Sequence, residues 1–260
     1  MNTDYNAASA HAHYAPWFDW ALPVALASIG FIIIHRFDLE LFELARRLER
    51  ALPSDLRREW FAWQQYGQGV AIIFTALLIW TLSPIHRRRL LDLALALAIA
   101  QLCSTAGKML IARPRPRESL MDPHSFPGPW GVYPVEVKGS GQSVWRLAHG
   151  WDRASGSSDL WSMPSSHALF AAMLSAFVAT LWPRAAWPLI IAATVVALGR
   201  VVFGAHWPSD VVVGSMLGLA IGLTITRRGL GVRFFDWFWI RFIDRAAQPA
   251  WARIRSDHNA

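Results

Sequence analysis

The sequence is poor in cysteine and in charged side chains. It has a single cysteine, Cys103, among 260 residues, so a disulfide framework is excluded. Charged residues make up only 17% of the chain, against about 25% in an average soluble domain. Basic runs occur only beside apolar segments, which argues against nucleic-acid binding despite the formal net charge of +7. The first apolar segment, Trp17–His35, lacks a basic leader and a small-residue cleavage site, so we expect it to be retained.

The sequence is rich in hydrophobic residues, and many of them lie in long apolar runs. Hydrophobic residues make up 54% of the chain, and the mean hydropathy is +0.27. Several apolar runs approach the ~20 residues that cross a bilayer as a helix. The sequence therefore predicts an all-α fold, a polytopic membrane bundle of about six transmembrane helices forming a single domain over residues 1–260. The expected spans are Trp17–His35, Gly69–Pro84, Leu90–Ala112, Pro164–Trp182, Trp187–Phe203 and Pro208–Thr226.

Two further stretches have the pattern of amphipathic, interfacial helices. Residues 36–68 are rich in charge with leucines at helical spacing, and a second short helix is expected to begin at Ser54, after Pro53. We favour an interfacial connector between two spans; the alternative is a helix pair that controls how lipid reaches the protein interior. The tail, residues 229–260, begins with a Trp/Phe-rich stretch that we expect to lie at the cytoplasmic interface.

Arginines follow the second, fourth and sixth expected spans and predict the topology. They are Arg87, Arg88, Arg89, Arg184, Arg227 and Arg228. The positive-inside rule puts these turns in the cytoplasm, which suggests a bacterial inner membrane with the opposite ends facing outward. The outward face then includes residues 113–163, expected to be an irregular polar loop, and the turn Arg200–Asp210. Asp92, near the arginine-rich end, is expected to reach toward the membrane surface.

The turn Arg200–Asp210 carries ionisable residues between two apolar segments, and such groups at membrane depth usually mark a functional site. The same face also carries Lys108, Arg115, Ser165, Ser166, His167 and His206. This excess of positive charge around two histidines favours an anionic phosphate over the alternative, a bound metal, so neither a metal nor another cofactor is expected. Arg113 and Arg117 are predicted to be solvated loop charges.

Two histidines allow a two-step phosphoryl transfer, in which one attacks phosphorus and the other protonates the leaving oxygen. Asp210 lies four residues after His206, so its carboxylate is expected to fix the imidazole tautomer. The helix that starts at Pro164 is expected to direct its first N–H groups, with Ser165, at the anion.

These residues resemble the type 2 phosphatidic acid phosphatase family, whose core is shared with the vanadium haloperoxidases. The family pattern K-x6-R-P is matched by Lys108 to Pro116, and P-S-G-H by Pro164 to His167. The third pattern, S-R-x5-H-x3-D, is matched by Arg200, His206 and Asp210. The resemblance covers the motif-bearing core, residues 90–226, and leaves out the N-terminal third and the tail.

The resemblance implies His206 as the nucleophile, Asp210 as its orienting partner, and His167 as the general acid that later activates water. The implied phosphate-binding residues are Lys108, Arg115, Ser165, Ser166 and Arg200. Ser166 replaces the family glycine, so a side chain is expected to crowd the pocket. Gly199 replaces the family serine, so one hydroxyl contact is expected to be lost.

The sequence thus predicts metal-independent hydrolysis of a lipid phosphate monoester or diphosphate at the extracytoplasmic face through a phosphohistidine. The expected partners are the lipid phosphate substrate and the lipid bilayer. Candidate substrates are phosphatidic acid, phosphatidylglycerol phosphate, undecaprenyl diphosphate and lipid A phosphate. A lipid phosphotransferase with the same site is the main alternative. A vanadate-dependent haloperoxidase is disfavoured by the membrane spans, and a non-catalytic transporter or scaffold by the intact histidines.

Overall fold

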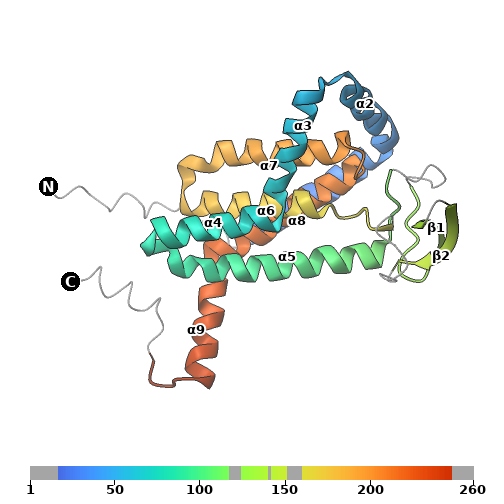
Figure 1. The fold of residues 1–260 in the computed structure, drawn as a ribbon. Coiled ribbons are helices and arrows are strands. Elements are labelled where there is room, and N and C mark those ends of the chain that lie inside the picture. The colour runs from blue at the N-terminus through green and yellow to red at the C-terminus, as the bar shows by residue number, and fades with distance from the viewer. Residues whose placement is uncertain (1–16, 117–123, 140–141, 151–159, 248–260) are drawn as a thin grey trace.

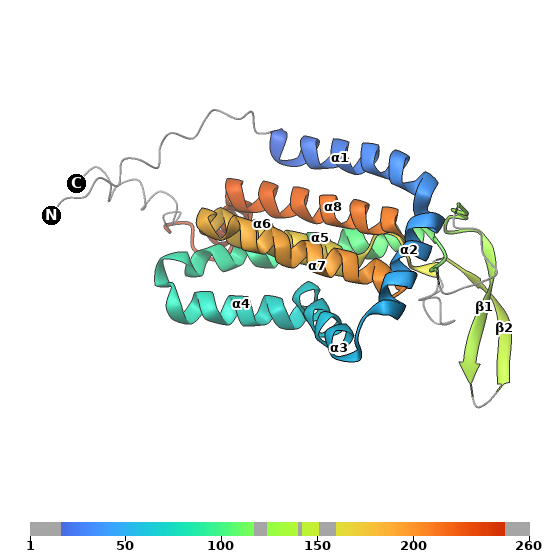
Figure 2. The same ribbon diagram turned by 90° about the horizontal axis from the view of Figure 1, so that it is seen from above.

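The computed structural model describes residues 17–116, 124–139, 142–150 and 160–247. Apolar helices run side by side in a bundle (Figures 1 and 2). They are α1 (Phe18–Ile34), α4 (Gly69–Leu82), α5 (Leu90–Ile111), α6 (Ser166–Leu181), α7 (Ala186–Val202) and α8 (Pro208–Arg228). Their starts and ends lie close to the boundaries expected from the apolar runs, because each segment must satisfy its own backbone polar groups in a membrane.

The all-helical membrane bundle is confirmed, with four or five candidate spans in the described residues. Four continuous helices, 18–51, 84–111, 183–202 and 208–228, are long and apolar enough to cross a membrane. A fifth span would be formed if α4 and the helical segment before it, bent by 64°, crossed together. The expected number of about six is reached only by adding α6, which is apolar but has 16 residues.

The connector after α1 is helical, as predicted. A 3-10 turn, η2 (His35–Phe37), joins α1 to α2 (Asp38–Ala51), and α3 (Ser54–Trp63) begins directly after Pro53. A second 3-10 turn, η3 (Gln64–Gly67), leads into α4. Figure 2 shows that α2 and α3 lie at one end of the bundle, beside the end of α7.

α2 turns its leucines away from the protein. Leu41, Leu44 and Leu48 are exposed, whereas the acidic residues Asp38 and Glu49 of the same helix are buried. The apolar face is therefore available to lipid, and the acidic face packs on the bundle. This arrangement supports an interfacial connector, because a helix of a water-soluble domain would bury its leucines instead.

Close packing of α6 against α8 brings the beginnings of these two helices together. Gly214, Gly218 and Gly222 repeat every fourth residue on the face of α8 that meets α6. A Cβ at Gly214 would lie 2.5 Å from the carbonyl oxygen of Ser165, and one at Gly218 would overlap that of Leu169. Small residues at this spacing let two membrane helices touch backbone to backbone.

The loop expected to be irregular contains a β-hairpin instead. β1 (Val132–Gly139) pairs with β2 (Gln142–His149) in an antiparallel register. Alternating residue types in both segments are compatible with strands, a short period that is easily missed inside a long polar loop. The hairpin lies at the same end of the bundle as α2 (Figure 2).

Asp92 does not reach toward the membrane surface, and that expectation was wrong. Its carboxylate is fully buried and accepts hydrogen bonds from the backbone N–H groups of Gly231 (2.7 Å) and Val232 (3.1 Å). These groups belong to the first turn of α9 (Leu230–Phe242), so the carboxylate caps that helix. α9 points away from the bundle (Figure 1), as an interfacial helix would.

Replacing Gly218 by alanine is predicted to destabilise the protein by about 1–3 kcal/mol, because the new methyl group overlaps the backbone of α6. Gly69→Ala is the matched control, since a Cβ at Gly69 meets nothing within 4 Å. Thermal unfolding of both purified variants in the same detergent measures the difference. Equal melting temperatures for the two variants would contradict the proposed close packing.

Candidate active site

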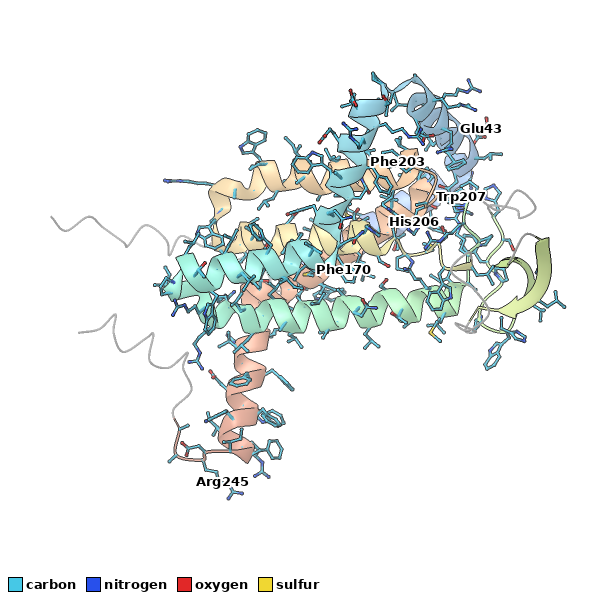
Figure 3. The ribbon with its side chains drawn as sticks, in the orientation of Figure 1. Glu43, Phe170, Phe203, His206, Trp207 and Arg245 are labelled. Carbon is cyan, nitrogen blue, oxygen red and sulfur yellow. The ribbon has the colours of Figure 1, made fainter. Side chains whose placement is uncertain are left out.

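His206 lies in the short turn between α7 and α8, where two spans meet (Figure 3). Gly204, with φ of +69°, reverses the chain after α7. The N–H groups of Ala205 and His206 then donate to the carbonyl of Arg200 at 3.0 and 3.1 Å. These bonds hold the turn against the end of α7, and the His206 side chain is buried, with 2% exposure. α8 begins at Pro208, as predicted.

The proton on His206 is fixed by a backbone carbonyl. Nδ1 lies 2.7 Å from the carbonyl oxygen of Ser162, which can only accept a hydrogen bond, so Nδ1 carries the proton. Nε2 of the neutral ring therefore keeps its lone pair. Asp210, expected to fix the tautomer directly, has its nearest oxygen 3.9 Å from Nδ1.

Asp210 supports His206 through neighbouring groups instead. Its Oδ2 accepts hydrogen bonds from the hydroxyl of Ser162 and from the N–H of Trp207, the latter at 3.0 Å. The carboxylate therefore orients the residue whose carbonyl holds the imidazole. The i, i+4 spacing brought the two side chains near each other, but the carboxylate is already bound by other donors.

Three cations surround the imidazole and keep it neutral. Burial lowers the pKa of His206 well below its usual range, and the charges of Arg115, Arg200 and Lys108 lower it further. The same three cations are within electrostatic reach of His167. Arg115 is held near the turn by a hydrogen bond from Nη1 to the carbonyl of Ala205 at 3.3 Å.

Ser166 positions Lys108. The Ser166 hydroxyl is bonded to the hydroxyl of Ser104 at 2.8 Å and accepts a hydrogen bond from the Lys108 ammonium. Its side chain is thus directed at α5, so its contacts do not support the expected crowding of the phosphate pocket. Both the lysine and its serine anchor lie where α5 and α6 meet.

The glycine at position 199 makes room for the N-terminal connector. A Cβ at Gly199 would overlap the side-chain amide of Gln64 and lie 3.0 Å from Nε1 of Trp60. Trp60 also donates a hydrogen bond to the carbonyl of Val195 at 2.9 Å. Where the family pattern has a serine, this chain therefore packs α3 and η3 directly on α7.

Ser165 stands at the N-cap of α6 with its hydroxyl directed to no partner among the described residues. The residue is fully buried, and its N–H donates to the carbonyl of Asp210 at 3.2 Å. A buried hydroxyl is costly without a hydrogen bond, so this one is well suited to an anion bound at the beginning of α6.

His167 has a partner from outside the three motifs. Its Nε2 lies 2.9 Å from Nε2 of Gln68, the residue that precedes α4. The two segments are in direct contact, since a Cβ at Gly67 would lie 2.5 Å from the carbonyl oxygen of His167. Gln68 therefore holds one ring nitrogen of His167, and no pattern in the sequence indicated this contact.

Arg113 is fully buried, so the expectation of a solvated loop charge was wrong. Nη1 donates to Asp210 Oδ1 at 2.5 Å and to the Ser209 hydroxyl at 2.8 Å, and Nη2 donates to Asp38 Oδ2 at 2.6 Å. Asp38 in turn accepts from the N–H (2.9 Å) and hydroxyl (2.6 Å) of Ser209. Arg117, predicted to be solvated as well, lies outside the described residues.

Aromatic rings complete the burial of this guanidinium. Its carbon lies 5.0 Å from the ring centre of Phe126 and 5.6 Å from that of Trp207, both within cation–π range. Trp207 also donates through Nε1 to the carbonyl of Pro114 at 2.8 Å. Arg113 and its partners thereby join the loop after α5, the turn between α7 and α8 that carries His206 (called the catalytic turn below), and α2.

The structure brings all the predicted site residues to one end of the bundle. The functional neighbours that sequence reasoning missed are Asp38, Gln68, Ser104, Arg113, Ser162 and Ser209. The sequence did contain one indication that Asp38 is buried. Asp38 lies opposite the leucine face of α2, so if the leucines contact lipid, Asp38 must face the protein.

Comparison with known proteins agrees with this arrangement. Residues 89–231 match the PAP2 superfamily, and the chain belongs to that superfamily. Membership makes it an enzyme of the lipid phosphate phosphatase class, as the three motifs predicted. No curated protein gives a significant sequence match.

Two solved structures share the fold. One is Aquifex aeolicus LpxE, with 19% identity, a TM-score of 0.51, and 73% of this chain and 94% of that chain covered. The other is a transmembrane PAP2 type phosphatidylglycerolphosphate phosphatase from Bacillus subtilis, with 17% identity, a TM-score of 0.52, and 82% and 96% covered. The aligned region extends beyond the superfamily match, so the fold likeness reaches past the three motifs.

Asp38→Ala is predicted to destabilise the protein by about 3–5 kcal/mol, because it removes one of two carboxylates that neutralise a buried arginine. Asp55→Ala is the control, since Asp55 is 84% exposed and its ion pair with Arg58 is solvated. Chemical unfolding in detergent measures both. A small, equal effect of the two substitutions would show that Asp38 is not needed to hold Arg113.

The pH dependence of stability is predicted to report the buried imidazole. An unfolded histidine titrates near pH ~6.5, whereas the folded pKa of His206 lies well below this value. As the pH falls below about 6.5, only the unfolded chain takes up this proton, so the free energy of unfolding falls by up to ~1.4 kcal/mol per pH unit. His206→Asn should therefore melt with a shallower pH dependence between about pH 7 and pH 5.

His124→Asn serves as the control for replacing a histidine, since His124 is exposed. If His206→Asn and wild type lost stability equally on acidification, His206 would not be the group held neutral.

Proposed function

We propose that this protein hydrolyses a lipid phosphate monoester or diphosphate, without a metal, at the extracytoplasmic face and through a phosphohistidine on His206. The observation that carries the proposal is the fixed tautomer of His206, with its proton on Nδ1 and its lone pair on Nε2, beside three cations. A neutral imidazole nitrogen is a competent nucleophile, and the cations favour a phosphate dianion in front of it.

In the first step, Nε2 of His206 attacks phosphorus, and the bond from phosphorus to the leaving oxygen breaks. His167, which takes up a proton when the phosphate dianion offsets the charge of the nearby cations, gives that proton to the leaving oxygen and becomes neutral, so the lipid leaves as an alcohol or as a lipid monophosphate. Charge on the transferring phosphoryl group is balanced by Lys108, Arg115 and Arg200, while Ser165 and the first N–H groups of α6 supply hydrogen bonds.

In the second step, His167 takes a proton from a water molecule that attacks the phosphohistidine. The phosphorus–nitrogen bond breaks, inorganic phosphate leaves, and His206 returns to its neutral form. Gln68 keeps the His167 ring in place during both transfers. The excess of positive charge would repel a divalent cation, which supports a reaction without one.

Charge and packing support the proposed location. Positive residues at the end opposite the catalytic turn lie in the turns before α5 and α7 and at the end of α8. The positive-inside rule would leave that end in the cytoplasm and the catalytic end outside. A lipid substrate fits this position, because α2 offers its leucines to the membrane beside the site.

His206→Asn is predicted to lower phosphate release from phosphatidic acid by on the order of 10⁴-fold or more, since the nucleophile is removed. His167→Asn should lower it by about 10²–10⁴-fold. His86→Asn should retain wild-type activity, because His86 belongs to the 3-10 helix η4 (Pro84–Arg89), which joins α4 to α5 at the other end of the bundle. Release of phosphate by the purified proteins in detergent is the measurement.

A labelled aryl phosphate separates the two steps. Its leaving group needs no protonation, so the His167→Asn variant should form the phosphohistidine and hydrolyse it slowly. The trapped label should be stable in base and lost in acid, as expected for a phosphorus–nitrogen bond. Undiminished turnover by His206→Asn would refute the proposed nucleophile, and label transferred to an added lipid acceptor would indicate a phosphotransferase instead.

A further inference from the structure

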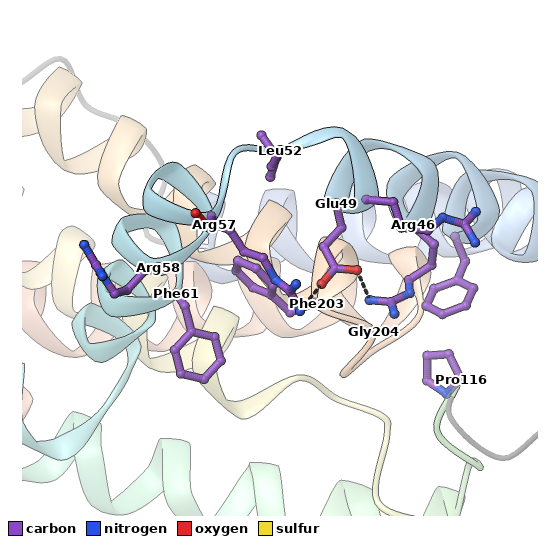
Figure 4. Close-up of a pocket in the computed structure, with 12 residues that line it drawn as sticks. Arg46, Glu49, Leu52, Arg57, Arg58, Phe61, Pro116, Phe203 and Gly204 are labelled. Atoms are coloured by element: carbon purple, nitrogen blue, oxygen red, sulfur yellow. Dashed lines mark ion pairs between the residues drawn. The ribbon is translucent and has the colours of Figure 1, made fainter.

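A large pocket lies directly beside the catalytic turn and is not part of the site described above. Its volume is about 1170 Å³, and it is open to the outside and lined by residues of α2, α3 and the turn after α7 (Figure 4). Its basic residues are Arg46, Arg50, Arg57 and Arg58, and its larger apolar residues are Phe42, Leu52, Phe61, Pro116 and Phe203.

Positive charge dominates this pocket. Glu49 is the only acid among the lining residues that the structure describes, and it is shared by Arg46 and Arg57 at 2.7 Å each. Arg58 pairs with Asp55, an exposed residue outside the lining. Arg50 is exposed and has no hydrogen-bond or ion-pair partner among the described residues.

Four arginines around a single acid favour a phosphate group, because guanidinium groups offer paired N–H donors that match phosphate oxygens. The buried Glu49 holds two of these arginines in place, with 5% of its side chain exposed. The aromatic rings among the lining residues suit the apolar part of an amphiphile. The pocket therefore fits the phosphorylated headgroup of a lipid better than a free anion.

The chain segment that leads into the catalytic turn also forms part of the pocket wall. Arg46 donates through Nη1 to the carbonyl of Val202 at 3.1 Å, and Phe203 and Gly204 line the pocket three and two positions before His206. A Cβ at Gly204 would lie 3.4 Å from Nη1 of Arg46, so the bare glycine lets this arginine approach the turn.

The loop after α5 makes the same connection from the other side. Pro116 lines the pocket, and its neighbour Arg115 is one of the cations beside His206. A molecule with one phosphate at His206 and a second group in the pocket would therefore touch the two faces of one short stretch of backbone.

We propose that the arginine pocket binds a second phosphate of the substrate, so that the preferred substrate is a lipid carrying two phosphate groups, of which one is hydrolysed. This inference rests on the proposed function. Arg50 and Arg57 contribute the charge that the second phosphate neutralises, and Arg46 couples the pocket to the catalytic turn through the carbonyl of Val202.

The test compares two substrates with the same acyl chains in vesicles or micelles of zwitterionic lipid. Phosphatidic acid carries one phosphate, and phosphatidylglycerol phosphate carries a phosphomonoester and a second phosphate. The readout is the ratio of kcat/KM for the doubly phosphorylated lipid to that for the singly phosphorylated lipid. The full-length chain is used throughout.

Arg50→Gln combined with Arg57→Gln should lower this ratio by about 10-fold or more, the loss expected from removing charged hydrogen bonds to phosphate. Arg50→Gln alone breaks no ion pair in the described structure and should give part of the effect in a fully folded protein. Arg47→Gln is the matched control, because Arg47 lies on the same helix, is 72% exposed, and is absent from the pocket lining.

An unchanged ratio in the double variant, with both lipids still hydrolysed, would overturn the pocket assignment and leave the proposed function intact. Failure of the wild-type protein to hydrolyse either lipid would instead refute the proposed function. Repeating the assay with anionic phosphatidylglycerol in the vesicles separates the two sources of phosphate. If the arginine substitutions matter only there, and equally for both substrates, the pocket binds membrane headgroups and the assignment to the substrate is wrong.

Discussion

The buried ion network of Asp38, Arg113 and Asp210 is the interaction on which the arrangement of the catalytic end depends. Three charged side chains with no measurable exposure are tolerated only because each finds oriented partners, and loss of one would leave another unpaired. The network joins the start of α2, the loop after α5 and the first turn of α8. The position and orientation of the turn that carries His206 are thus set by three buried residues from distant parts of the chain.

A second constraint comes from backbone contact between α6 and α8. The glycines of α8 bring the N–H of Ser165 within hydrogen-bond distance of the carbonyl of Asp210, so the start of α6 and the first turn of α8 are in direct contact. Preorganised donors are effective because they need no rearrangement as charge develops. The connector adds Gln68 to His167 and a basic pocket to the other face of the turn, so the N-terminal third shapes the site as well.

Much of the fold could be predicted because a membrane imposes a simple rule on the sequence. Apolar length and proline or arginine boundaries were enough to locate the helices, including the start of α3 after Pro53. The hairpin of residues 132–149 and the buried state of Asp92 could not be predicted in the same way. A polar loop outside the membrane does not need to be helical, so its apolar length does not predict its structure. Whether a carboxylate such as that of Asp92 is buried depends on which N–H groups another helix presents to it.

By itself, the sequence determined the chemistry available to the protein. The spacing of Lys108, His167 and His206 at helix ends was sufficient to identify the superfamily and to expect convergence on a phosphate. Only the tertiary structure decided how these groups are held. Asp38 and Ser209 are bonded across 171 positions, and Arg113 reaches Asp210 across 97. Such partners are chosen by helix packing, which no local pattern records, so Arg113 became a buried support and Ser162, rather than Asp210, became the direct partner of His206.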